Sequence, residues 1–308
     1  MKGFKGYLMV LGAAFFWGSS ATGAKFLINH NVDTVVIVQA RVTFTALILL
    51  PFLFFFRREA LRIRLRDLWR FLLSGILGVA GANFTYYFTI KESTVATGIL
   101  IQYTAPLLVL AYAVHAGEER FTAIKVGAAL LSLFGCFLAV GAYDPRVLRI
   151  TPIGLVTGLA SVVCFAFLNV YTRKLLRMYP FWSVTFYSIA GASLFWLCVR
   201  PPWTLFPGNG AGYPWEGLFV LAIFSILIPH SLYFSGLRMV VPSRAIITST
   251  MEPIVAITSA AIVLGEGLAG LQTVGAVLVV LAIVLLQVRR EPGMALAQSP
   301  AQVDHGDD

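Results

Sequence analysis

This sequence predicts an all-α membrane protein with ten transmembrane helices, arranged as two inverted five-helix repeats. Three observations support the prediction: an apolar composition, ten apolar runs, and motifs that recur in the two halves of the chain. Of the 308 residues, 58% are hydrophobic and 12% are charged. Typical soluble domains contain about 45–50% apolar residues and about 25% charged residues. A soluble protein of this size could not bury so much apolar surface, which excludes a soluble enzyme or binding domain.

Ten apolar runs follow one another along the chain, and each is long enough to cross about 30 Å of hydrocarbon as a helix. The first half of the chain contains runs at residues 6–28, 34–56, 69–90, 94–114 and 121–142. The second half contains runs at residues 152–173, 181–199, 213–237, 242–264 and 270–288. We therefore expect two five-helix units, residues 1–146 and 147–290, followed by a disordered cytoplasmic tail, residues 291–308.

The formal net charge of +9 indicates the orientation of these helices. With the N-terminus inside, 17 of the 23 Lys and Arg residues lie on the cytoplasmic side, five lie outside, and Arg41 lies within the second run. Short cytoplasmic loops are enriched in Lys and Arg, so both termini are predicted to be cytoplasmic. We expect a lipid bilayer around the chain and no nucleic-acid partner. The cluster from Arg57 to Arg70 fits contact with anionic lipid.

Motifs recur in the same order in the two halves. In the fourth run Gln102–Pro106 precedes Gly117-Glu118, and in the ninth run Ser249–Pro253 precedes Gly265-Glu266. The spacing from proline to Gly-Glu is 11 residues in one half and 12 in the other. An odd number of helices per repeat gives the second copy the opposite orientation in the membrane. Inverted repeats that meet near the midplane are typical of alternating-access transporters.

The combined pattern resembles the EamA-type permeases of the drug/metabolite transporter superfamily. It consists of Trp17-Gly18-Ser19, Arg41 at the start of the second run, Glu252-Pro253 and the two Gly-Glu loops. The resemblance covers about residues 6–288. It implies a ten-helix carrier whose cavity lies between helices 1–4 and 6–9. Members of the family export amino acids, aromatic compounds and other metabolites, or exchange sugar-linked substrates. The second half has Gly265-Glu266-Gly267 where a Gly-Glu-Arg loop is common, at a distance from the implied cavity.

Two charged residues lie within apolar runs, where a charge costs about 2.5–3.5 kcal/mol on translocon scales. Glu252 lies near the middle of the ninth run and precedes Pro253, which removes one helical hydrogen bond. Its carboxylate could bind a cationic group or a proton, or it could instead be a structural group that stabilises the kink. Arg41 could anchor a substrate carboxylate or phosphate. The alternatives for Arg41 are an ion pair, for which Glu252 is one candidate partner, or a side chain that extends to the membrane surface.

Other candidates are aromatic and polar side chains within the runs. Trp17 lies mid-run, away from the membrane interface where tryptophans concentrate. Rings with polar groups suit a cavity for apolar or aromatic solutes, although many of the 24 phenylalanines must serve packing alone. His230 is a second candidate for proton coupling beside Glu252, with a structural role as the alternative. The predicted substrate-binding residues are Trp17, Arg41, Asn83, Tyr87, Gln102, Tyr103 and Glu252.

Motifs for catalysis, nucleotide binding and metal binding are absent from the sequence. It contains no HExxH, no GxSxG, no GxxxxGK[ST] and no Cys/His ligand spacing. We therefore expect no enzyme activity, no cofactor and no metal. The expected function is secondary transport, by alternating access, of small organic metabolites, with export of amino acids or of aromatic and amphoteric compounds favoured. The protein is expected in the bacterial plasma (inner) membrane as a monomer or homodimer. A lipid scramblase or flippase is the alternative.

Overall fold

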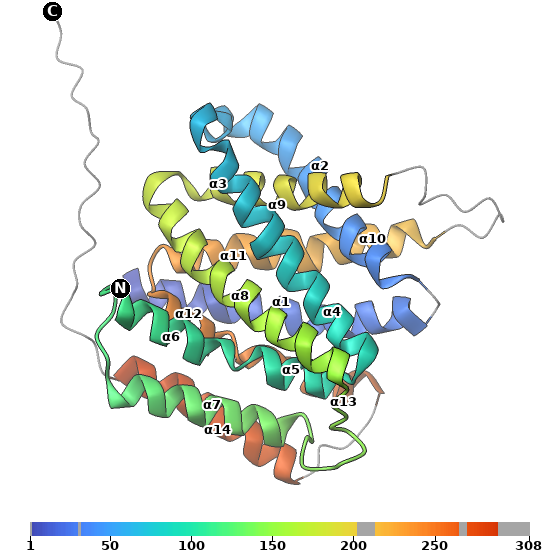
Figure 1. The fold of residues 1–308 in the computed structure, drawn as a ribbon, viewed down its shortest axis with the longest axis vertical. Helices are drawn as coiled ribbons and strands as arrows, with labels where there is room; N and C mark the ends of the chain where they lie inside the picture. Colours follow the sequence, from blue (N-terminus) through green and yellow to red (C-terminus); the bar gives the residue numbers. More distant parts are fainter. Residues whose placement is uncertain (1, 30–31, 202–212, 265–269, 289–308) are drawn as a thin grey trace, which may run out of the picture.

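The structure is a computed structural model, and it describes residues 2–29, 32–201, 213–264 and 270–288. Within these ranges every regular element is a helix and there is no strand, which confirms the predicted all-α class (Figure 1). The predicted tail at 291–308 and the Gly265-Glu266 loop lie outside the described residues.

Helices occupy all ten predicted runs. The first half contains α1 (Lys2–Asn29), α2 (Thr34–Phe56), α3 (Leu68–Leu73), η3 (Ser74–Gly81), α4 (Ala82–Glu92), α5 (Val95–Gln102), α6 (Ala105–His115) and α7 (Ala123–Ala139). The second half contains α8 (Pro152–Met178), α9 (Phe181–Val199), α10 (Trp215–Ala222), η5 (Ile223–Leu227), α11 (Ile228–Leu237), α12 (Pro242–Thr248), α13 (Met251–Leu264) and α14 (Gly270–Val288). The elements η3 and η5 are π-helical stretches that continue into α4 and α11.

Within the part of the chain that the structure describes, six helical stretches are long and apolar enough to cross a membrane, so the chain is a multi-pass membrane protein. They are Thr34–Phe56, Leu65–Glu92, Val95–His115, Pro152–Met178, Phe181–Val199 and Trp215–Leu237.

The fourth and ninth predicted runs are each broken into two helices. The breaks lie at Tyr103-Thr104, between α5 and α6, and at Ser249-Thr250, between α12 and α13. Each break lies about one turn before a proline, Pro106 or Pro253. Because proline has no N–H, the carbonyl four residues earlier loses its α-helical partner. The loosened backbone expected at Pro253 is therefore present, one turn upstream of the proline itself.

The first helix of each half packs against helices of the other half. Helix α1 contacts α11 and α13, whereas α8 contacts α4, α5 and α6. Helices α7 and α14 lie side by side at one edge of the bundle (Figure 1). Because α1 packs among helices of the second half, its middle, with Trp17, lies against α11 and α13.

The pair α7 and α14 depends on two glycines. A Cβ atom at Gly275 would lie 2.4 Å from the Ala139 nitrogen and 2.5 Å from the Gly135 carbonyl oxygen. Such distances are too short for any side chain, so the two backbones touch at this crossing. A Cβ atom at Gly127, on the same helix as Gly135, would meet no neighbouring atom within 4 Å.

We expect Gly275→Ala to destabilise the protein, because the added methyl group forces α7 and α14 apart. Overpacking of this kind costs about 1–3 kcal/mol. The measurement is the Tm of the purified protein in detergent. Gly127→Ala is the matched control and should leave the Tm unchanged or slightly raised, and an equal Tm for the two variants would contradict the packing described.

Candidate functional site

Arg41 is a buried charged residue whose guanidinium makes three hydrogen bonds to other helices. It projects from α2 and is only 4% exposed. Its Nε donates to Ser225 Oγ at 2.6 Å, its Nη1 to the Tyr87 hydroxyl at 2.6 Å, and its Nη2 to the Ser225 carbonyl oxygen at 3.3 Å. Among the described residues it forms no ion pair, so the expected alternatives of a pair with Glu252 or a side chain extended to the surface are both wrong. Neutral groups from α4 and η5 solvate this cation instead.

Pro229 explains why the Ser225 carbonyl is available. This proline lies four residues after Ser225 and has no N–H, so the carbonyl loses its usual helical donor. It accepts instead from Arg41 and from Trp17 Nε1, the latter at 3.2 Å. Ser225 belongs to the π-helical stretch η5, a kind of element that occurs frequently at functional sites. Ser225 is not among the residues predicted from the sequence, although Pro229 four residues later was the signal that could have identified it.

Trp17 joins α1 to α11 through aromatic contacts. Its ring lies 5.5 Å from that of His230, edge-on, and 5.2 Å from that of Tyr233. The Tyr233 hydroxyl in turn donates to Asn169 Oδ1 on α8. His230 is 4% exposed and also packs against the ring of Phe234. Trp17, Arg41, Tyr87, Ser225 and His230 therefore form one cluster, which we call the arginine cluster.

Glu252 belongs to a second cluster at the α12–α13 break. The Tyr103 hydroxyl lies 2.8 Å from Glu252 Oε2 and 3.2 Å from the Ser249 carbonyl oxygen, and it can donate to either. Pro253 follows Ser249 by four residues and removes the α-helical donor of this carbonyl, which accepts instead from the Glu252 backbone N–H at 2.9 Å and can accept a second hydrogen bond from Tyr103. We call Tyr103, Ser249 and Glu252 the glutamate cluster.

Close packing of α1 on α13 brings the two clusters together. A Cβ atom at Gly18 would lie 2.5 Å from the Glu252 carbonyl oxygen and 2.8 Å from Val255 Cβ. Only glycine allows this approach, and Gly18 directly follows Trp17 of the arginine cluster. The backbone contact thus places the two clusters on adjoining segments.

Two predicted site residues take no part in these clusters. Asn83 Nδ2 donates to the Val79 carbonyl one turn earlier in its own helix, at 2.8 Å. Gln102 is half-buried at the end of α5, and its amide makes no hydrogen bond within the described residues. The structure therefore groups Trp17, Arg41 and Tyr87, and separately Tyr103 and Glu252.

Both charged groups keep binding capacity. A guanidinium carries five N–H donors, and three of those of Arg41 have partners in the described structure. The two that remain, one on each Nη, can receive a carboxylate in the forked geometry typical of arginine. In the Glu252 carboxylate, Oε2 accepts from Tyr103 and Oε1 has no partner among the described residues. The site can therefore offer an anion-binding and a cation-binding group beside aromatic rings.

Comparison with known proteins gives a consistent result. The model of the EamA-like transporter family matches residues 4–141 and again residues 152–288. The uncharacterized inner membrane transporter YicL of Salmonella typhimurium is 26% identical over 292 residues, covering 92% of this chain and 95% of that protein. The aromatic amino acid exporter YddG of Ancylobacter novellus is 28% identical over 140 residues, covering 44% and 47%. One solved crystal structure superimposes with a TM-score of 0.76 at 19% identity, covering 92% of this chain and 96% of the other, which shows a shared fold.

We expect Tyr87→Phe to lower the free energy of unfolding, because it removes the hydroxyl that accepts from the Arg41 guanidinium. A hydrogen bond to a charged group contributes about 1.5–3 kcal/mol. Tyr86→Phe is the matched control: it is the adjacent tyrosine, and its hydroxyl makes no hydrogen bond within the described residues. Thermal unfolding in detergent checks the difference, and a Tm for Tyr87→Phe no lower than for Tyr86→Phe would contradict the role assigned to Tyr87.

Proposed function

The chain belongs to the EamA-like transporter family of the drug/metabolite transporter superfamily, and on this premise we propose that it is a secondary transporter that exports small amphoteric metabolites. Amino acids, and aromatic ones among them, are the favoured substrates, and the bacterial inner membrane is the proposed location. The observation that carries the proposal is the pair Arg41 and Glu252. They carry opposite charges in adjoining clusters, Arg41 buried and Glu252 half-buried, and each is bound to neutral groups rather than to the other.

A zwitterion carries the two charges that the clusters would bind. Its carboxylate would receive the two remaining Nη donors of Arg41, and its ammonium group would bind Glu252 together with Tyr103. The rings of Trp17 and Tyr87 would contact the substrate side chain, which favours apolar and aromatic groups. The similarity to an aromatic amino acid exporter supports this substrate class. Export by alternating access would then expose the site to one side of the membrane at a time.

The proposed architecture is that of ten membrane-spanning helices in two inverted repeats with cytoplasmic termini. Three features support it: the family model matches each half, the first helices of the halves pack reciprocally, and both halves contain a π-helical stretch followed by a broken helix. Broken helices near the membrane midplane are typical of substrate sites in inverted-repeat transporters. The scramblase alternative has less support, because Arg41 and Tyr103 are buried between helices instead of lining a groove open to lipid.

Counterflow in proteoliposomes tests the function. Vesicles loaded with unlabelled phenylalanine should accumulate radiolabelled phenylalanine, and vesicles without the protein should not. Arg41→Lys keeps the charge and loses the forked donors, so we expect the apparent KM for phenylalanine to rise about tenfold to a hundredfold, the equivalent of about 1.5–3 kcal/mol. Arg177→Lys, a substitution at an exposed arginine, is the control and should leave the apparent KM for phenylalanine unchanged. Equal KM values for Arg41→Lys and the wild type would exclude Arg41 as the carboxylate anchor.

Proton coupling through Glu252 is tested separately. If this carboxyl group takes up a proton during the cycle, an imposed pH gradient should change the rate of phenylalanine flux in the wild type. Glu252→Gln cannot titrate, so we expect its flux to be independent of the gradient. Glu216→Gln removes an exposed carboxylate at the start of α10 and should respond like the wild type. A pH response that survives in Glu252→Gln would rule out Glu252 as the coupling group.

A further inference from the structure

The turn between α11 and α12 is held by polar contacts from three separate parts of the chain. We call this turn, from Leu237 to Arg244, the α11–α12 tip. It joins the eighth and ninth predicted runs on the side expected to be cytoplasmic. The three parts that hold it are the loop between α6 and α7, the start of α1, and the end of α8.

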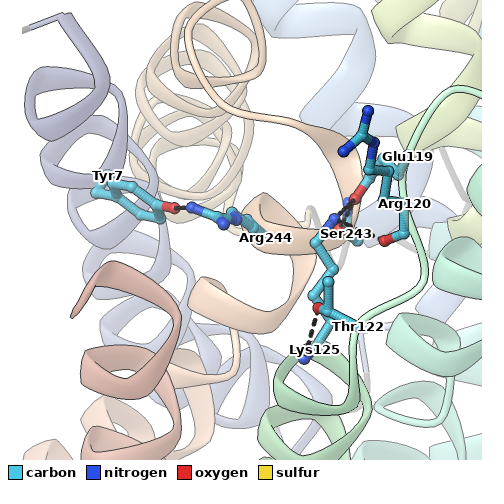
Figure 2. Close-up of polar contacts among 7 residues, drawn as sticks. All are labelled: Tyr7, Glu119, Arg120, Thr122, Lys125, Ser243 and Arg244. Atoms are coloured by element: carbon cyan, nitrogen blue, oxygen red, sulfur yellow. Dashed lines mark hydrogen bonds and ion pairs between the residues drawn. The ribbon is translucent and has the colours of Figure 1, made fainter. Parts of the chain in front are cut away.

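The first contact centres on Glu119, in the loop between α6 and α7 (Figure 2). This residue is 5% exposed, and its Oε2 lies 3.0 Å from Lys125 Nζ. The Ser243 hydroxyl donates to the same carboxylate, and the Ser243 backbone N–H donates to Oε1 at 3.3 Å. The buried lysine balances the charge of Glu119, as a buried carboxylate requires. The carboxylate therefore links the first half of the chain to the tip.

The other two contacts also use ionised side chains. Arg173, near the end of α8, donates through Nη1 to the Leu237 carbonyl oxygen at the start of the tip. Arg244, at the end of the tip, donates through Nη1 to the Tyr7 hydroxyl of α1 at 3.3 Å (Figure 2). The apolar part of the tip packs against α1 as well, since a Cβ atom at Gly6 would lie 2.6 Å from Val240 Cγ2.

The corresponding turn of the first half is held differently. This α4–α5 tip, residues 92–97, lies on the opposite side of the bundle in the predicted topology. Thr94 and Thr97 donate to the carbonyl oxygens of Val147 and Arg149, each at 2.8 Å. The Ser93 hydroxyl lies 3.3 Å from that of Thr151. These partners are neutral, and hydrogen bonds that involve an ionised group are roughly twice as strong.

We propose that the α11–α12 tip is the cytoplasmic gate of the transporter, held closed by Glu119, Arg173 and the contact of Arg244 with Tyr7. The inference rests on the proposed function, because a gate presupposes alternating access. Opening to the cytoplasm requires these contacts to break and the tip to move away from α1, α8 and the α6–α7 loop. Glu119 is a positioning residue: it fixes the start of α12, the short helix that leads directly to the Ser249 carbonyl and Glu252 of the site.

Two alanine variants near the Glu119–Lys125 pair distinguish a gating role from a role in packing alone. Ser243→Ala removes the hydroxyl that connects Glu119 to the tip and leaves the Glu119–Lys125 pair intact. Thr122→Ala removes a hydroxyl of the same cluster that caps α7 through the Lys125 N–H, entirely within the first half (Figure 2). A gate predicts that only Ser243→Ala shifts the population towards the state open to the cytoplasm.

Sided labelling of a cysteine reports that population. Gln102→Cys, beside the α5–α6 break, is introduced into a protein whose Cys136, Cys164 and Cys198 are replaced by alanine. A membrane-impermeant maleimide is then applied to inside-out and to right-side-out vesicles. We expect Ser243→Ala to speed labelling from the cytoplasmic face about tenfold, the equivalent of about 1.4 kcal/mol, and to slow it from the outer face. Thr122→Ala should match its parent on both faces.

Equal labelling of the Ser243→Ala and Thr122→Ala proteins, or faster labelling from both faces together, would overturn the gate. If Ser243→Ala does not fold, Tyr7→Phe removes the Arg244 contact at the other end of the tip and should shift labelling in the same direction. The assay requires no substrate, so its outcome is distinct from that of the transport assay. Normal counterflow with unchanged labelling refutes the gate alone. Shifted labelling without counterflow refutes the proposed substrate alone.

Discussion

The interior of this protein is organised by one constraint: a polar group surrounded by apolar helices must find a partner within the chain. Two prolines create the need. Pro229 leaves the Ser225 carbonyl without its α-helical donor, and Pro253 removes that of the Ser249 carbonyl, which accepts from the Glu252 backbone N–H instead. Trp17 and Arg41 donate to the first carbonyl, and Tyr103 donates to the second. These two carbonyls thus hold side chains of both clusters, and the hydrogen bonds link α1 and α2 to η5 and the end of α5 to the α12–α13 break.

The chemical nature of the groups that contact Arg41 and Glu252 matters for function. A direct ion pair between Arg41 and Glu252 would neutralise both groups and leave little to attract a substrate. Hydroxyl and carbonyl oxygens accept from the Arg41 guanidinium, and the Tyr103 hydroxyl donates to the Glu252 carboxylate, so each group is hydrogen-bonded without a direct contact to an opposite charge. A ligand that carries both charges can then provide an anion to pair with Arg41 and a cation to pair with Glu252. Such a ligand would bind most strongly when desolvated between the clusters, which is consistent with a site that closes around its substrate.

Sequence reasoning located the helices well and the contacts between them less well. The predicted limits of α2, α9 and α14 coincide with those in the structure, because turn residues and charges, such as the capping Asp33 before α2, mark the ends of long apolar runs. The break at Ser249-Thr250 follows from Pro253 and was accessible from sequence. Ser225 was missed, and Asn83 was included although its amide bonds within its own helix, because pairing across helices depends on packing that a single sequence does not display. The buried pair Glu119–Lys125 was missed for the same reason.

The central claim is that Arg41 and Glu252 together recognise the two charges of a zwitterion. Ligand-induced thermal stabilisation of the purified protein tests it directly with three probes: phenylalanine, phenylalaninamide and N-acetylphenylalanine. The amide lacks the carboxylate, and the acetylated compound lacks the ammonium group. A ligand raises the Tm in proportion to its binding to the folded state, so we expect phenylalanine to raise it and each analogue to have little effect. Equal stabilisation by phenylalanine and either analogue would contradict the claim, because one of the two charges would then be unnecessary.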